Sequence, residues 1–234
     1  MEDEVGVAGT GNERGPQGTA AGTMGVSGQP IGSTADQGTL LLRPWAESDA
    51  PGLREAIDED VSHLKPWLSW TFAEPATLEQ TQARLRGYVE EFRSGKAYRY
   101  AIAAPDRPTH ILGGVGLNHR VGPAAHDVGY WVRRSVARQG IAAAAVSALA
   151  VHAFSRTSIE RLVIQCDVAN QASASMARAL GFELIGQVMT TNPDGSPRPV
   201  LQFELARSSY ELSYAQTFRA RSRRVRFVAA MAAL

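Results

Sequence analysis

Between residues 39 and 207, short apolar runs alternate with segments whose apolar side chains recur at helical spacing. The short runs predict strands at 40–42, 98–104, 111–117, 126–132, 162–167, 182–188 and 200–206. The helical spacing predicts helices that begin after 48–49, at Thr77, after Gly140 and at Asn170. Hairpins followed by helical crossovers predict an α/β fold: a central, mixed, twisted sheet of six to seven strands with helices on both faces.

The two ends of the chain lack this pattern. Residues 1–38 are rich in Gly, Thr, Ser and Gln with few large apolar side chains, so we expect a disordered leader before a folded domain at 39–207. Residues 208–234 form a basic C-terminal extension, which could touch an anionic membrane or ribosomal RNA, or remain a mobile solvated extension. Its arginines are Arg219, Arg221, Arg223, Arg224 and Arg226.

Composition narrows the class of protein. A hydrophobic fraction of 44% over 234 residues supports a real core, and a net charge of +1 gives no bulk-charge argument for nucleic-acid binding. The single cysteine, Cys166, excludes an internal disulfide and a cysteine-based zinc site, and we interpret it as a small buried hydrophobe. No metal is expected. No run is apolar enough to span a membrane and no secretory signal is evident, so we expect a cytoplasmic protein.

The stretch from Gly129 to Phe154 is a candidate anion site. It reads as a strand, a basic loop closed by Gly140, and an alanine-rich helix. Backbone N–H groups at a helix start are unpaired and positively polarised, so they can donate to a phosphate. Charge and further donors come from Arg133, Arg134, Arg138 and Gln139. The loop alone is equally compatible with a plain core helix, because short glycine motifs are weak signals.

A second block, DVANQASASMARALGFELIG, makes the first more specific. Asn170 is placed to cap a helix, Ser173 lies three residues on, and Gly181 can adopt the left-handed conformation that closes it. Together, GYWV–x–R–x–x–x–RQGIA and N–x–x–S…LGF resemble the GCN5-related N-acetyltransferases (GNAT superfamily), most of all the RimJ/RimL-type branch. LLRPW, HLKPWLSW and GGVGLN fit the same branch, and the likeness runs from about Thr39 to Arg207.

The resemblance implies a site for acetyl-CoA where two parallel strands separate. The strand end at Trp131 would hydrogen-bond the pantetheine arm, and backbone N–H groups around Gly140 would hold the pyrophosphate. The family usually carries Gln or Arg where this chain has Ala137, so the backbone donors are the part expected to bind. The implied coenzyme residues are Trp131, Val132, Arg133, Arg138, Gln139, Gly140, Ile141, Ala142, Ala143, Asn170 and Ser173.

The implied reaction is direct attack of a neutral amine on the thioester. A backbone N–H near Val132 would polarise the carbonyl, and Ser173 matches the position that protonates the leaving thiolate. Asp127 stands where many relatives carry a glutamate on the motif strand, and would be the base directly or through water. His126 and His119 are alternatives.

The amine acceptor is the least defined part. Trp67 and Trp70 follow the first helix, where relatives shape the acceptor pocket, and we expect them to bind the acceptor with Asn118, although both tryptophans fit core packing equally well. A protein N-terminus, a ribosomal protein being one candidate, and a small-molecule amine both stay open. The chain could instead be a non-catalytic acyl-CoA-binding module with a partner-binding basic tail. A monomer and a homodimer are both expected possibilities.

Overall fold

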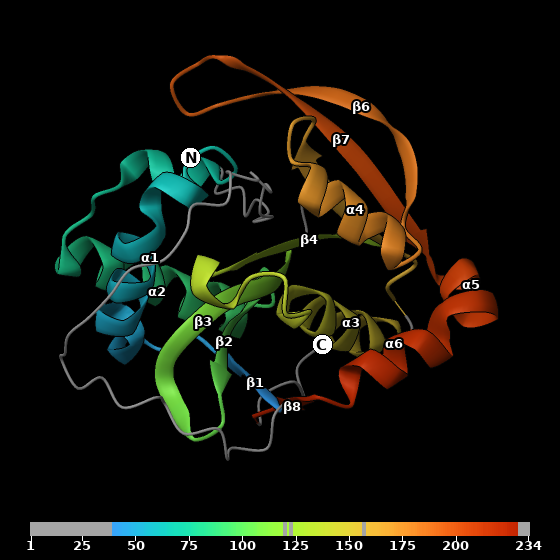
Figure 1. Ribbon diagram of the computed structural model, residues 1–234, viewed down its shortest axis with the longest axis horizontal. Coiled ribbons are helices and arrows are strands. Elements are labelled where there is room, and N and C mark those ends of the chain that lie inside the picture. The colour runs from blue at the N-terminus through green and yellow to red at the C-terminus, as the bar shows by residue number, and fades with distance from the viewer. Residues whose placement is uncertain (1–38, 119–120, 122–123, 156–157, 229–234) are drawn as a thin grey trace, which may run out of the picture.

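The computed structural model describes residues 39–118, 121, 124–155 and 158–228. The chain forms a mixed sheet in the order β6-β7-β5-β4-β3-β2-β1-β8 (Figure 1). Most neighbours are antiparallel, while β4 pairs with β5 and β1 with β8 in parallel. The strands are β1 (Leu40–Pro44), β2 (Ala97–Ala104), β3 (Arg107–Asn118), β4 (Ala125–Val132), β5 (Arg161–Asp167), β6 (Glu183–Thr191), β7 (Pro197–Ala206) and β8 (Val225–Phe227).

Helices cover both faces of the sheet, as predicted. In Figure 1, α1 (Ala50–Leu64) and α2 (Leu78–Arg93) lie together at one side, and α3 (Ile141–Phe154) and α4 (Gln171–Ala179) lie across the strands. Short 3-10 turns occur at η1 (Glu47–Asp49), η2 (Ser69–Ala73) and η3 (Arg134–Val136). The C-terminal segment adds α5 (Arg207–Ser209), the π-helix η4 (Tyr210–Tyr214) and α6 (Ala215–Ser222).

The alternation of side chains along β4 divides the core in two. Tyr130 and Val132 belong to the larger apolar cluster, which includes α3 and α4. Trp131, between them, belongs to the second cluster, with residues of α1 such as Leu53 and Ile57. Successive strand residues point to opposite faces, so β4 is a wall shared by the two halves of the molecule.

The parallel pair at the centre of the sheet separates. The β4–β5 ladder joins Ala125, His126 and Asp127 to Arg161, Leu162 and Val163. Both strands continue beyond the ladder, β4 to Val132 and β5 to Asp167. The carboxyl ends of two parallel strands therefore part next to the starts of α3 and α4, a typical ligand position in an open sheet.

Local signals in the sequence place the helix ends. Thr77 caps α2 in a capping box with Gln80, and the Asn170 side chain accepts a hydrogen bond from the Ser173 N–H at 3.1 Å. Gly140 and Gly181 adopt positive φ, +77° and +81°, at the start of α3 and after α4. These four positions confirm the predicted boundaries within a residue or two.

The C-terminal segment differs from its prediction. Residues 207–227, expected as a basic extension beyond the domain, form helices and a strand that pack on the domain. Phe218 is fully buried and Tyr210 is 5% exposed, both in the cluster that includes α3. β8 then adds an eighth strand beside β1, where six or seven strands were expected. The folded unit therefore extends past the expected boundary at Arg207. The expected leader at 1–38 lies outside the described residues.

Over the part of the chain that the structure describes, no helix is long and apolar enough to cross a membrane.

Candidate active site

The start of α3 presents unpaired backbone donors. The first intrahelical hydrogen bond runs from the Ala144 N–H to the Gly140 carbonyl at 2.9 Å. The N–H groups of Ile141, Ala142 and Ala143 therefore precede the hydrogen-bond ladder. Arg138 is also in a left-handed conformation, with φ of 63°, so the chain turns sharply into the helix over three residues. This geometry suits a phosphate group.

A cleft lies against these donors. A cavity of about 170 Å³ is lined by the loop and α3, by Val132 of β4, by Met176 of α4 and by His63 at the end of α1. Its walls include most of the predicted coenzyme loop: Val132, Arg138, Gly140, Ile141, Ala142 and Ala143. The residues present therefore fit an elongated ligand that carries a phosphate at the helix start.

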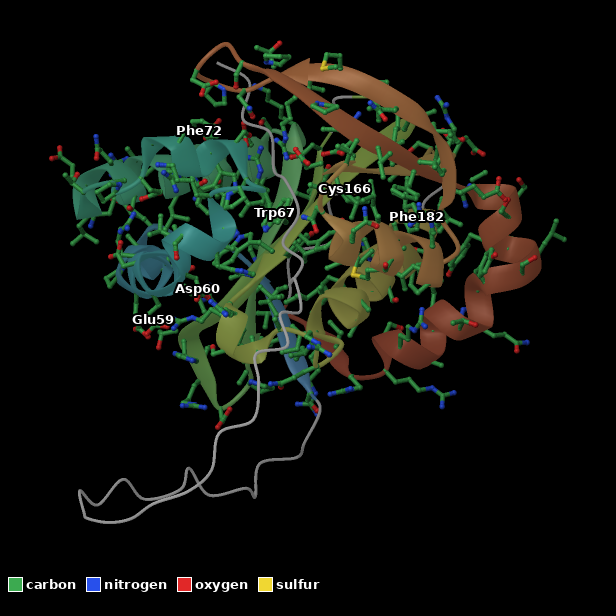
Figure 2. The ribbon with its side chains drawn as sticks, turned by 45° about the horizontal axis from the view of Figure 1, so that its top comes forward. Glu59, Asp60, Trp67, Phe72, Cys166 and Phe182 are labelled. Atoms are coloured by element: carbon green, nitrogen blue, oxygen red, sulfur yellow. The ribbon has the colours of Figure 1, made fainter. Side chains whose placement is uncertain are left out.

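The Arg133 side chain does not join this loop, contrary to the expectation that its charge would help hold the phosphate. The Arg133 side chain is 3% exposed, and its guanidinium donates to the Ile111 carbonyl at 2.6 Å, to Glu59 at 2.6 Å and to Glu55 at 3.1 Å. Figure 2 labels Glu59 and Asp60 near the end of α1. Arg133 fastens β4 to α1. Gln139 lies on the exposed turn, with its side chain 3.5 Å from the Ser135 carbonyl.

His63 is the site residue that sequence reasoning missed here. Burial lowers the pKa of its imidazole, with Asp60 raising it and Arg134 lowering it further. Its Nε2 is buried without a hydrogen-bond partner among the described residues. The ring therefore enters the cleft in the neutral form. The signal in the sequence was weak, because a single histidine near a helix end is common.

Ser173 meets a tyrosine at the base of α4. Its hydroxyl lies 2.8 Å from the Tyr130 hydroxyl, and both residues are buried. Burial raises the pKa of Tyr130, and the hydrogen bond with Ser173 offsets this only in part, so the phenol stays protonated. Burial likewise raises the pKa of the Cys166 thiol, which sits in the core as expected. Asn170, at the N-cap, is 2% exposed and holds the same turn.

Asp127 lies where the β4–β5 ladder ends. It is 7% exposed and accepts a hydrogen bond from the Asn118 amide at 3.2 Å across the β3–β4 pair. Asp127 lies four positions before Trp131, so both side chains occupy the same face of β4. His126 points to the other face and is buried. His119, the remaining candidate base, lies outside the described residues.

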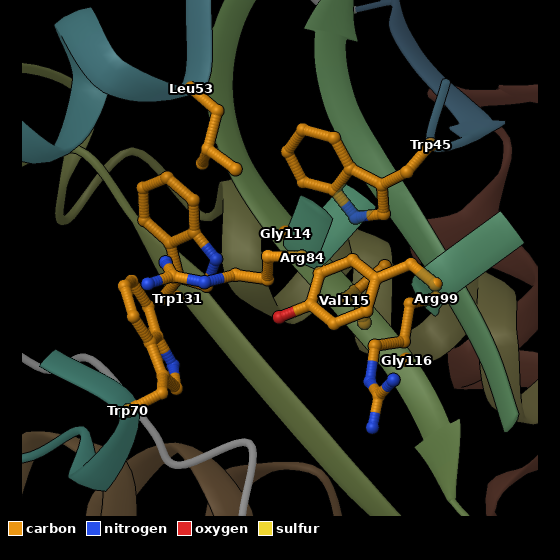
Figure 3. Close-up of a pocket in the computed structure, with 10 residues that line it drawn as sticks. Trp45, Leu53, Trp70, Arg84, Arg99, Gly114, Val115, Gly116 and Trp131 are labelled. Atoms are coloured by element: carbon orange, nitrogen blue, oxygen red, sulfur yellow. The ribbon is translucent and has the colours of Figure 1, made fainter. Parts of the chain in front are cut away.

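A second cavity lies on the α1–α2 side of β4 (Figure 3). Its volume is about 30 Å³, and aromatic side chains form much of its lining. Trp70 and Trp131 pack edge to face with ring centroids 6.1 Å apart, and the Arg84 guanidinium lies 5.3 Å from the Trp70 ring. Arg99 lies 4.5 Å from the Tyr88 ring. The lining residues are Trp45, Leu53, Trp70, Arg84, Tyr88, Arg99, Gly114, Val115, Gly116 and Trp131.

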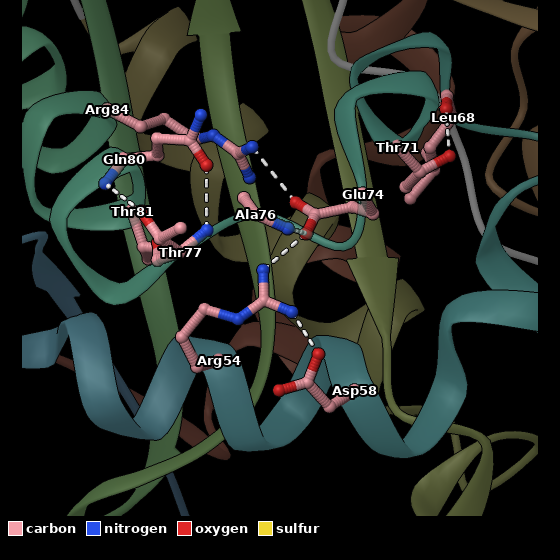
Figure 4. A network of polar contacts seen from close by, with 10 residues as sticks. All are labelled: Arg54, Asp58, Leu68, Thr71, Glu74, Ala76, Thr77, Gln80, Thr81 and Arg84. Atoms are coloured by element: carbon pink, nitrogen blue, oxygen red, sulfur yellow. Dashed lines mark hydrogen bonds and ion pairs between the residues drawn. The ribbon is translucent and has the colours of Figure 1, made fainter.

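A buried carboxylate supports this wall (Figure 4). Glu74, whose side chain is fully buried, pairs with Arg54 of α1 and, at 2.9 Å, with Arg84 of α2. It also accepts from the Ala76 N–H at 2.8 Å. Burial alone would raise the pKa of Glu74, but these hydrogen bonds and charges hold it below its ordinary value. The network fixes Arg84, and so one side of the cavity, in place.

The predicted acceptor residues do not all meet. Trp70 lines the cavity, whereas Asn118 is directed to Asp127 and Trp67 packs at the edge of the second cluster. Figure 2 shows Trp67 in the space between the helical side and the β6–β7 hairpin, and its carbonyl accepts from Arg198 of β7 at 2.7 Å. Arg84 and Arg99 were missed, because nothing in the sequence distinguishes them from surface arginines.

A parallel-strand separation, a glycine-started helix beside it, and cavities on both faces of the motif strand are the features of an acetyl-CoA-dependent acyltransferase. The acetyltransferase (GNAT) domain family matches residues 39–183, and the chain belongs to this family. It is an acetyl-CoA-dependent N-acetyltransferase, as the two sequence blocks predicted. Among the described residues, no cluster of side chains could hold a metal ion.

The chain is similar to enzymes that are named as acetyltransferases of ribosomal proteins. It is 30% identical to the ribosomal-protein-serine acetyltransferase of Escherichia coli (strain K12) over 151 residues, 63% of this chain and 81% of the relative. It is 28% identical to the solved RimL, a ribosomal L7/L12 α-N-protein acetyltransferase in complex with coenzyme A, with a TM-score of 0.66 over 77% of this chain and 98% of that one.

A more distant structure shares the fold. The microcin C7 self immunity acetyltransferase MccE, in complex with acetyl-CoA and AMP, has a TM-score of 0.66 at 21% identity, over 72% of this chain and 92% of that one.

Proposed function

We propose that the acceptor is the α-amine of a protein N-terminus that begins with a small residue, and that the substrate is a ribosomal protein. The observation that carries this is the cavity of about 30 Å³ beside Trp131, which the rings of Trp45, Trp70 and Tyr88 narrow, so that it favours a small first side chain over an aromatic one. The relative at 30% identity is named for the acetylation of a ribosomal-protein serine, which supports the same class.

The polar groups around the cavity favour a peptide acceptor. Arg84 and Arg99 line the cavity, and each pairs with a carboxylate, Arg84 with Glu74 and Arg99 with Glu91. The Nη1 atom of Arg84 and the Nε atom of Arg99 are buried without a hydrogen-bond partner among the described residues. These N–H groups can donate to the carbonyls of a peptide.

The residues on β4 and α4 are proposed to move the protons. Asp127 would accept the proton that the amine loses as its nitrogen–carbon bond forms, directly or through water. Ser173 would give a proton to the sulfur as the carbon–sulfur bond breaks, with Tyr130 as the group that orients its hydroxyl. Asp127 and Trp131 share the acceptor face, while Tyr130 and Ser173 lie on the coenzyme face, so the strand separation is the passage between them.

The test is a panel of acceptors in the presence of acetyl-CoA. Peptides that begin with Ser or Ala should release thiol and gain one acetyl group at the α-nitrogen, read by mass spectrometry. The matched peptide that begins with Phe should react at least tenfold more slowly, and the N-terminally blocked peptide should not react. Faster turnover of spermidine or an aminoglycoside than of these peptides would overturn the proposal.

We also propose a cellular location and an oligomeric state for the protein. A ribosomal-protein substrate implies a cytoplasmic enzyme. A monomer and a homodimer are both compatible with a site built within one chain.

A further inference from the structure

The C-terminal segment borders the coenzyme cleft. Beyond the cavity at the start of α3 lies a second one of about 310 Å³, and the two share Gly140, Ala143 and Met176. The far wall of this second cavity is built by Arg221 and Arg224. In Figure 1, α6 runs alongside α3. The two cavities are therefore adjacent, and the second extends from Gly140 of the phosphate-binding loop to two arginines that lie outside the family match at 39–183.

This segment is held firmly. Phe218 is fully buried in the main core. The ring of Tyr214 packs on Gly181, where an added Cβ would lie 2.5 Å from it. The chain then leaves α6 and joins the sheet, with the Leu40 N–H donating to the Arg224 carbonyl at 2.5 Å. The backbone that carries the arginines is therefore as fixed as the sheet edge.

The side chains at the cleft are placed for an anion. Arg221 is half-buried and donates from one nitrogen to the Ala179 carbonyl at 3.1 Å, at the end of α4. A guanidinium has five N–H donors, so this contact orients the group and leaves donors for a ligand. The apolar remainder of the cavity, from Ala143 to Leu180, offers a surface for a flat ring.

We propose that Arg221 and Arg224 bind the 3′-phosphate of the coenzyme. The ribose that carries the pyrophosphate of coenzyme A also carries this phosphate, so a pyrophosphate at the start of α3 places the 3′-phosphate one sugar away. The shared cavity wall leads from that point to the two arginines. The C-terminal segment is thus a specificity element that distinguishes coenzyme A from its 3′-dephospho form. The inference rests on acetyl-CoA use and not on the identity of the acceptor.

The experiment is a ligand-and-variant cycle by calorimetry at low salt. The wild-type chain should bind coenzyme A about tenfold more tightly than 3′-dephospho-coenzyme A, a magnitude expected of two partly exposed ion pairs. Arg221→Gln combined with Arg224→Gln should bind the dephospho form as the wild type does and coenzyme A about tenfold more weakly. The preference should also shrink with added salt.

The matched control removes the same charge from the same segment. Arg223→Gln combined with Arg226→Gln changes two exposed arginines that do not line the cavity, and it should keep the wild-type preference. Equal loss for both ligands in the Arg221/Arg224 variant, or equal loss of preference in the control, would overturn the proposal. Equal binding of both ligands by the wild-type chain would also overturn the proposal. If the wild-type chain bound neither ligand, the use of acetyl-CoA itself would be contradicted. Urea unfolding of each variant checks that the fold is kept.

Discussion

The pair formed by Tyr130 and Ser173 gives a sharp test of the site. Ser173→Ala removes the hydroxyl that lies 2.8 Å from the Tyr130 hydroxyl. Because the Tyr130 phenol is completely buried and stays protonated, its hydroxyl has lost this partner in the variant. The free energy of unfolding should therefore fall by about 1–3 kcal/mol. Tyr130→Phe leaves the serine hydroxyl in the same position and should cost a similar amount.

The double variant removes both partners and leaves no orphaned hydroxyl. We expect the double variant to cost about as much as one single variant, so the coupling free energy should have a magnitude of about 1–3 kcal/mol. Each kcal/mol corresponds to a shift of roughly 2–4 °C in Tm for a chain of this size. Urea unfolding followed by fluorescence of the four tryptophans measures the free energy of unfolding of all forms.

Ser147 supplies the matched control. Its hydroxyl is buried in α3 and has no hydrogen-bond partner among the described residues. Ser147→Ala should therefore be neutral or stabilising, in contrast to Ser173→Ala. Strict additivity of the Tyr130 and Ser173 variants would refute the hydrogen-bond argument.

The same variants separate structure from chemistry. If Ser173 protonates the thiolate, Ser173→Ala should lower kcat by about 100-fold or more, within the range of general acid catalysis. Tyr130→Phe only frees the serine to rotate, and its effect should be smaller. Wild-type kcat in Ser173→Ala, measured with saturating acetyl-CoA, would remove Ser173 from the proposed mechanism.

Three further predictions concern single residues. Glu74→Gln leaves two arginines without their shared buried carboxylate and should lower the free energy of unfolding by about 3–5 kcal/mol. Because the pKa of Glu74 is lowered on folding, its contribution is present above the ordinary value of 4.5 and lost as pH falls through the folded value, so the variant should show a shallower acid limb. The pKa of His63 is also lowered on folding, so as pH falls below 6.5 the unfolded chain takes up the proton before the folded chain does. The free energy of unfolding, measured by urea titration, should therefore fall in this range, and it should fall less in His63→Gln. Gly140→Ala forces φ of +77° on a residue with a Cβ and should cost about 1 kcal/mol and weaken coenzyme binding in calorimetry, whereas Gly186→Ala, with open space and no positive φ, should do neither.

The elements could be predicted because their signals are local. Thr77 and Asn170 cap helices through hydrogen bonds within three residues, and Gly140 and Gly181 are needed for their backbone conformation. The helix start after Gly140 and the place of Ser173 in the first turn of α4 followed from the same local pattern, whereas their predicted coenzyme roles came from the family resemblance.

The partners of charged side chains depend on the fold and could not be predicted. Arg133 follows the motif strand like a phosphate ligand, but the register of β4 directs it to α1. Glu74 and Arg84 meet only when α1 and α2 pack, so their network was not visible in the sequence.

The C-terminal segment was misread for a similar reason. Its arginines dominate the composition, whereas the large apolar residues that hold it are few. They are Tyr210, Tyr214 and Phe218, four positions apart, and the alternating Val225 and Phe227 of β8. Those five residues were the available signal.

The parallel pairing of β1 with β8 has a consequence for biosynthesis. The strand β1, at Leu40, pairs with a neighbour at Val225 that the ribosome makes after the other seven strands of the sheet. During synthesis the outer edge of β1 is an open template for unwanted strand pairing, and the contact that closes it spans nearly the whole folded chain. The strand β8 and the cavity wall that carries Arg221 and Arg224 come from the same C-terminal segment, so both form late. A chain released before this segment is made would lack both.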